Sequence, residues 1–181
     1  MNTKKLSVRD ICYIGIFTAD IVVCAQLSIP MPYGVPLTLQ TFAIPLAGVV
    51  LGARRGVLST LIYILLGAAG IPVFAGLRGG LDIVIGPTGG FILSFPLMAL
   101  SAGIGELKSG KLWLVTWLVL GTVINYLCGM FFFSLVVSSS LKTAFIACVL
   151  PFVPTGIIKI AFVAVCGRMI KRALTESGLL T

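Results

Sequence analysis

Six apolar runs, separated by short polar or glycine-rich segments, make up most of this chain. They cover residues 11–29, 38–52, 56–71, 83–105, 112–137 and 142–170. A membrane-spanning helix needs about 20 apolar residues, within a range of about 17–25. The pattern therefore predicts an all-α integral membrane protein with six transmembrane helices, which form a single domain over residues 1–181.

Composition agrees with this prediction. The chain is 59% hydrophobic and 10% charged, whereas a soluble domain carries about 25% charged residues. Six spans use most of the 181 residues, so we expect no additional soluble domain.

The basic residues predict the orientation in the membrane. If the spans alternate in direction, one side receives Lys4, Lys5, Arg9, Arg54, Arg55, Lys108, Lys111, Arg168, Lys171 and Arg172, and the other receives Arg78 and Lys142. Cytoplasmic loops carry the excess of Lys and Arg, so both termini are expected in the cytoplasm. The net charge of +8 follows from this topology and does not indicate nucleic-acid binding.

Residues 29–42 are apolar but cannot form a regular helix. Pro30, Pro32 and Pro36 interrupt the segment, because proline lacks the backbone N–H and its ring clashes with the preceding turn. In a membrane, irregular backbone is tolerated only where protein or a water-filled cavity shields it from lipid. The segment is therefore predicted to cover a binding site.

The lengths of the next two apolar runs indicate where this site lies. As helices, they would be only about 22–24 Å long, which is shorter than a hydrocarbon core of about 30 Å. We therefore expect residues 29–37 and 72–82 to dip into the membrane from outside and to line an outward-facing cavity. Tyr33 and Phe74 are expected to face it.

The chain has little of the chemistry that enzymes use. It contains no histidine, and its five acidic residues are dispersed, which disfavours zinc sites and histidine-dependent proteases. Residues 70–80 are rich in glycine but lack the Lys-Ser/Thr of a phosphate-binding P-loop. We expect a binding protein without catalytic residues, metal or cofactor, which cannot itself use ATP to drive transport.

Lys159 is the strongest candidate for a binding residue. It follows Pro154-Thr155-Gly156 in the last apolar run, which is predicted to break there and to resume with Thr155 as its N-cap. Lys159 would then lie about one turn into the helix, near mid-membrane, where a lysine costs about 2.5–3.5 kcal/mol and needs a partner or water. Beside a helix N-terminus it favours an anion, most simply a carboxylate. Alternatively, Lys159 reaches the interface or pairs with Asp20.

Several other polar residues lie within or beside the apolar runs. Thr38, Gln40, Asn125 and Tyr126 offer donors and acceptors to a small polar ring. The alternative for each is a hydrogen bond to a neighbouring helix. Asp20 is likewise expected either to be neutral and bonded to a helix or to contact a ligand.

Three segments of the chain resemble the BioY family, the biotin-binding S-components of energy-coupling factor (ECF) transporters. The similarity is carried by Ile29-Pro-Met-Pro-Tyr-Gly-Val-Pro-Leu-Thr-Leu-Gln-Thr-Phe42, Gly70-Ile-Pro-Val-Phe-Ala-Gly-Leu-Arg-Gly-Gly80 and Pro87-Thr-Gly-Gly-Phe91. The resemblance implies a six-helix S-component bundle in a prokaryotic cytoplasmic membrane, with a vitamin site that faces outward. It also implies a transmembrane coupling protein and two ATPase subunits as partners, docked at Gly15 and Ala19 on the first helix.

The resemblance implies roles for individual residues. Lys159 would bind the biotin carboxylate, Phe74 and Tyr33 its apolar chain and thioether ring, and Asn125, Gln40 or Thr88 its ureido group. The complete predicted ligand-binding set is Tyr33, Thr38, Gln40, Phe74, Arg78, Gly79, Thr88, Asn125, Tyr126 and Lys159. In one respect the chain differs from the family pattern Pro-Gly-Asp-x-x-Lys, because Gly156 stands where the family has an acid.

The sequence is also compatible with two other functions. An S-component for another vitamin would change the ligand and keep the mechanism. A channel or scaffold subunit would bind no ligand tightly and would use residues 29–42 as a re-entrant segment.

Overall fold

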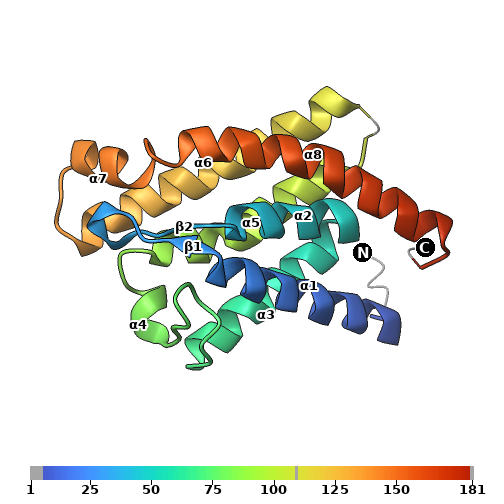
Figure 1. Cartoon of the computed structure of the whole chain (residues 1–181), viewed down its shortest axis with the longest axis horizontal. Coiled ribbons are helices and arrows are strands. Elements are labelled where there is room, and N and C mark those ends of the chain that lie inside the picture. Colours follow the sequence, from blue (N-terminus) through green and yellow to red (C-terminus); the bar gives the residue numbers. More distant parts are fainter. Residues whose placement is uncertain (1–5, 109, 180–181) are drawn as a thin grey trace.

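The computed structural model describes residues 6–108 and 110–179. Lys4 and Lys5, which were assigned to the cytoplasmic side, lie outside the described residues. Most of the described chain is helical and forms an elongated bundle (Figure 1). Its helices are α1 (Val8–Gln26), α2 (Gln40–Leu51), α3 (Ala53–Ala68), α4 (Leu81–Val84), α5 (Gly89–Gly105), α6 (Lys111–Val136), α7 (Leu141–Cys148) and α8 (Val153–Glu176).

The core is built around α5, which packs against α2, α3 and α6. Residues 43–51 of α2 are all buried, as are most residues of α5. Neither helix has a polar face, as expected for helices that are surrounded by protein on all sides. The remaining helices pack around this pair and expose many apolar side chains.

A single glycine makes the turn between α2 and α3. Gly52 has φ +83°, a backbone conformation that costs glycine little and other residues more. The turn is shorter than the two apolar runs suggest, because α3 begins at Ala53 and not at residue 56. With 12 residues in α2 and 16 in α3, the two helices are about 18 and 24 Å long, and both are shorter than the hydrocarbon core.

Two predicted spans are divided in the structure. The run at 83–105 separates into α4 and α5, and the run at 142–170 separates into α7 and α8. The predicted N-cap at Thr155 is wrong, because α8 begins at Val153 and takes Pro154 into its first turn, where the missing N–H is not needed. The Thr155 hydroxyl instead donates to the Phe152 carbonyl at 3.0 Å. Lys159 therefore lies nearly two turns into α8.

Helix length alone supports only part of the predicted topology. Among the described helices, α6 and α8 are long and apolar enough to cross a membrane, whereas α2 and α5 are apolar but shorter. The described chain is thus mostly helical, with two clear spans by this criterion.

Residues 29–42 contain a structure that the all-α prediction missed. Strands β1 (Ser28–Ile29) and β2 (Leu37–Thr38) form an antiparallel hairpin in which Ser28 pairs with Thr38. The prolines lie in the connection, which includes a 3₁₀ turn, η1 (Pro32–Gly34). Proline cannot donate a backbone hydrogen bond, so the pairing is confined to the ends of the segment.

Ion pairs lie at the end of the bundle where α1 begins and α8 ends; Figure 1 shows the position of these two helix ends. Arg55 pairs with Asp10 at 2.7 Å, and Arg168 and Lys171 pair with Glu106 at 3.0 and 3.4 Å. The hairpin, α4 and α7 lie at the opposite end.

Candidate ligand-binding site

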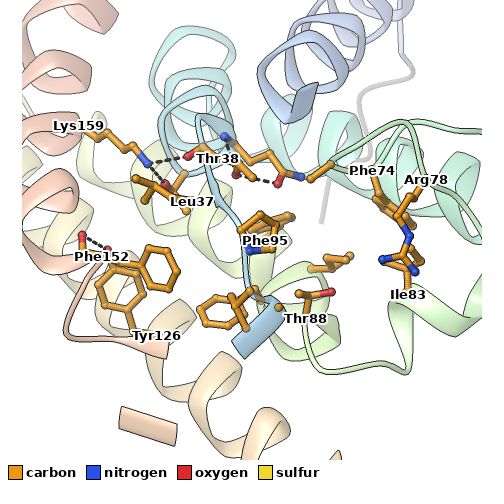
Figure 2. Close-up of a pocket in the computed structure, with 18 residues that line it drawn as sticks. Leu37, Thr38, Phe74, Arg78, Ile83, Thr88, Phe95, Tyr126, Phe152 and Lys159 are labelled. Atoms are coloured by element: carbon orange, nitrogen blue, oxygen red, sulfur yellow. Dashed lines mark hydrogen bonds between the residues drawn. The ribbon is translucent and has the colours of Figure 1, made fainter. Parts of the chain in front are cut away.

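A cavity lies between the hairpin, the loop that joins α3 to α4, and the N-terminal parts of α5 and α8 (Figure 2). Much of its wall is aromatic, with Phe74, Phe91, Phe95, Tyr126 and Phe152. Polar side chains are few and come from separate elements. This combination of an apolar lining with a few placed polar groups is typical of small-molecule sites.

Lys159 supplies a cation to the cavity from α8. Lys159 is only 9% exposed. Its Nζ lies 2.6 Å from the Thr38 carbonyl oxygen and 2.9 Å from Thr41 Oγ1. An ammonium group has three N–H donors, so these two bonds leave one for a ligand. Both partners are neutral. An anionic group in the cavity would supply the missing charge.

The alternative in which Lys159 pairs with Asp20 is not realised. No ion pair in the described part of the chain joins the two residues. In Asp20, Oδ1 lies 4.0 Å from the Cys24 sulfur.

A chain of hydrogen bonds continues from Thr38 into the protein. The Thr38 hydroxyl donates to Gln40 Oε1 at 2.8 Å, and Gln40 Nε2 donates to the Tyr63 hydroxyl at 2.6 Å. Tyr63 is fully buried on α3, and its ring packs edge-on against Phe74 with 5.5 Å between centroids. Tyr63 therefore supports both a polar and an aromatic part of the wall.

A second cation lies on the opposite side of the cavity from Lys159 (Figure 2). Arg78 belongs to the α3–α4 loop, where its backbone pairs with that of Phe74. Its guanidinium is 3.8 Å from Asp82, and both side chains are largely exposed. Such an exposed pair contributes little to stability, so the Arg78 side chain is free to turn toward a ligand.

Tyr126 lies beside Gly156, the position at which the sequence differs from the pattern that the resemblance implies. A side chain at Gly156 would begin 2.6 Å from the Tyr126 hydroxyl oxygen, so this glycine allows α6 and α8 to approach. The hydroxyl donates to the Phe152 carbonyl at 3.0 Å. Tyr126 thus occupies the space next to position 156.

Most of the predicted ligand-binding residues line this cavity. They are Thr38, Gln40, Phe74, Arg78, Thr88, Tyr126 and Lys159. These residues come from five different parts of the chain, which the fold brings together.

Three predicted residues lie outside the lining. Tyr33 is 61% exposed in the turn of the hairpin, and Gly79 packs against the backbone of Ile71. Asn125 is fully buried between helices, where its Nδ2 donates to the Phe91 carbonyl and to Ser94 Oγ at 2.9 and 2.8 Å. For Asn125 the structure realises the alternative of a helix–helix contact.

Several residues of the site were not predicted. Thr41 and Phe91 occur within the segments that resemble the family, so a closer inspection of those segments could have found them. Tyr63, Phe95 and Phe152 lie in ordinary apolar runs, where nothing in the sequence distinguishes them from core residues.

An apolar groove runs along the other side of Thr38 and Lys159. Leu39, Phe42, Ile158 and Phe162 are among its lining residues. Its position shows that Lys159 and β2 form a thin partition between the cavity and the surface of the bundle.

Gly15 and Ala19, the predicted docking residues, are both exposed on α1. Among the residues that the structure describes, no atom of another element lies within 4 Å of the position that a side chain at Gly15 would take. The two small residues therefore face away from the bundle.

Comparisons with known proteins agree with the predicted family. The model of the BioY family matches residues 1–176. The chain is 43% identical to the probable biotin transporter BioY of Pyrococcus horikoshii, over 86% of this chain and 92% of the relative. It is 39% identical to the biotin transporter BioY of Thermotoga maritima, over 93% and 99% of the two chains.

A solved structure shares the fold. It is described as the crystal structure at 2.1 Å of the S-component for biotin from an ECF-type ABC transporter, and it matches with a TM-score of 0.84. The sequences are 26% identical, over 91% of this chain and 92% of the other. The family match, the identity to two relatives over nearly their whole length, and the shared fold lead to one conclusion: this chain is a membrane protein of the BioY family.

Proposed function

We propose that this chain is the high-affinity biotin-binding subunit of an ECF-type vitamin transporter, which captures biotin outside the cell and delivers it inward. The observation that carries the proposal is the buried Lys159, which has one unused N–H at a cavity with an aromatic wall. Relatives named as biotin transporters support the choice of ligand. The protein binds and transports its ligand without changing it chemically.

In the proposed complex, the two ends of biotin meet different parts of the cavity. The carboxylate accepts a hydrogen bond from Lys159, and the aliphatic chain and thioether ring lie against aromatic residues such as Phe74 and Phe95. The ureido group needs acceptors for two N–H groups and a donor for its carbonyl, which Gln40 and Thr88 can supply. Where bound biotin displaces water from the cavity, each polar contact is stronger than in solution.

The proposed topology has six spans with both termini in the cytoplasm. The spans are α1, α2, α3, α4 with α5, α6, and α7 with α8, so that the cavity faces outward. The basic residues at the end where α1 begins and α8 ends support this orientation, as do Lys142 in α7 and Arg78 in the loop before α4, since α4 and α7 lie at the other end (Figure 1). The membrane is the cytoplasmic membrane of a prokaryote.

The proposed partners are a transmembrane coupling protein and two ATPase subunits, which supply the energy that this chain lacks. Gly15 and Ala19 are exposed and small, so a helix of the coupling protein can approach α1 closely there. Reorientation of the subunit against this partner would carry biotin inward.

Calorimetric titration of the purified full-length protein tests the proposal. We expect tight binding of biotin, weak or no binding of other vitamins, and severe loss of biotin affinity in Lys159→Ala. Lys142→Ala, which removes a lysine from α7, is the matched control and should bind like wild type. Preference for another vitamin would favour the related S-component, and no binding of any vitamin would favour a scaffold or channel.

A further inference from the structure

The α3–α4 loop forms the outer wall of the cavity, and residues 73–78 are its central part. Phe74 N–H donates to the Arg78 carbonyl at 2.8 Å, and Arg78 N–H donates back at 3.3 Å. This pairing places the Phe74 ring and the Arg78 side chain on the same part of the cavity wall (Figure 2). The conformation of this short segment therefore decides whether the wall is complete.

One side chain from a different element holds the segment at three points. Gln26 is the last residue of α1. Its Oε1 accepts a hydrogen bond from Leu77 N–H at 2.9 Å. Its Nε2 shares two hydrogens among three carbonyls, those of Val73 and Phe74 in the loop, each at 3.2 Å, and that of Val22 in α1 at 3.3 Å. The amide thus bonds to one donor and two acceptors of the loop backbone. A side chain that has only donors or only acceptors cannot do this.

Backbone strain in the loop shows why an external support matters. Leu77 has φ +54°, a left-handed conformation that residues other than glycine, asparagine and aspartate rarely adopt. The N–H of this same residue is the one held by Gln26. Loss of that bond would remove a support for Leu77 in its unfavourable conformation.

We infer that Gln26 is a positioning residue, which holds residues 73–78 over the cavity and so slows release of the ligand. It contacts the loop backbone and does not line the cavity, so it acts through Phe74 and Arg78. The inference rests on the proposed binding function. It adds a connection from α1 to the outer wall of the site.

Two variants and one control test this inference in the full-length purified protein. Gln26→Met keeps the length of the side chain and removes every hydrogen bond to the loop. Gln26→Glu keeps an acceptor for Leu77 N–H but presents a carboxylate to the carbonyls of Val73 and Phe74. Thr18→Val is the matched control, because it removes the bond from α1 to the Ser59 carbonyl (3.2 Å) on α3 without touching the loop.

Two measurements separate positioning of the loop from general damage to the fold. Trypsin cleavage after Arg78 in ligand-free protein reports the conformation of the loop. The dissociation rate of biotin reports how well the loop retains the bound ligand. The loss of three hydrogen bonds should accelerate both by about tenfold or more in Gln26→Met, with acceleration also in Gln26→Glu. Thr18→Val should stay within about twofold of wild type, since its hydrogen bond lies away from the site.

The results distinguish the inference from the function on which it rests. If Gln26→Met and Gln26→Glu are cleaved and release biotin like wild type, Gln26 does not position the loop. Equal acceleration in Thr18→Val would also overturn the inference, because the effect would then come from α1 packing. If the wild-type protein binds no biotin, the proposed function fails, while cleavage after Arg78 still shows whether Gln26 holds the loop.

Discussion

Replacement of Lys159 by methionine tests the binding site most directly. Methionine keeps most of the volume of the lysine stem and removes the ammonium group that donates to Thr38 and Thr41. The free protein already holds this buried cation, so most of the cost of burying it is met before the ligand arrives. Removal of the charge therefore weakens the bound state more than the free state.

The size of the effect follows from the geometry. Two opposite charges 4 Å apart attract by about 4 kcal/mol at an effective dielectric constant of about 20. A hydrogen bond between charged groups contributes about 1.5–3 kcal/mol after exchange with water. A net loss of about 2–4 kcal/mol corresponds to about 30- to 700-fold weaker binding of biotin.

Titration of two ligands isolates the contribution of the charge. Biotinamide has the same shape as biotin without its negative charge. We expect wild type to prefer biotin over biotinamide by about the same 30- to 700-fold, and Lys159→Met to bind both within about threefold of each other. Thr41→Val removes one acceptor of Lys159 but keeps the ammonium, so the preference for biotin should persist.

Two results would refute this reasoning. If Lys159→Met weakens the binding of biotin and of biotinamide equally, Lys159 acts only by supporting the hairpin through Thr38. If biotin affinity is unchanged, the carboxylate lies elsewhere, and Arg78 on the opposite side of the cavity is the next cation to test.

Four further substitutions test three other parts of the molecule. Tyr63→Phe leaves Gln40 Nε2 without its acceptor but keeps the aromatic contact, so titration should show about three- to tenfold weaker biotin binding; unchanged affinity would show that this support is dispensable. Gly15→Leu or Ala19→Leu should spare biotin binding and abolish cellular uptake, because the bulk blocks docking, whereas lost binding would contradict a docking role. Glu106→Gln removes the negative charge that pairs with two cations. It should lower the free energy of unfolding by about 1–3 kcal/mol, measured by thermal unfolding, and leave biotin affinity unchanged. A loss of affinity would contradict the conclusion that Glu106 lies away from the binding site.

Local features of the sequence were enough to predict the class of the protein. The apolar runs and the scarcity of charge indicated a membrane protein, because lipid imposes the same demand on every spanning segment. Pro30, Pro32 and Pro36 marked an irregular segment, since the restriction on proline is local. Lys159 was conspicuous for a similar reason: a lysine in an apolar run needs a partner wherever it occurs.

Predictions that depended on contacts between distant segments were less accurate. Asn125 and Gln40 look alike in the sequence, as polar residues within apolar runs. The fold places Gln40 on the cavity and turns Asn125 toward Phe91 and Ser94 of α5. The relative rotation of two packed helices decides this difference, and it depends on all the side chains between them.

The sequence by itself determined that the chain is a membrane protein, that prolines make one apolar segment irregular, and which lysine in an apolar run needs a partner. Only the tertiary structure decided that residues 28–38 form a hairpin, that Thr38 and Thr41 accept hydrogen bonds from Lys159, and that Gln26 bonds to a loop about 50 residues away along the chain. The reason is that some interactions act within single residues and others join distant parts of the chain. Backbone restrictions and the cost of burying a charge act on single residues, whereas a hydrogen bond between distant segments exists only after the helices have packed.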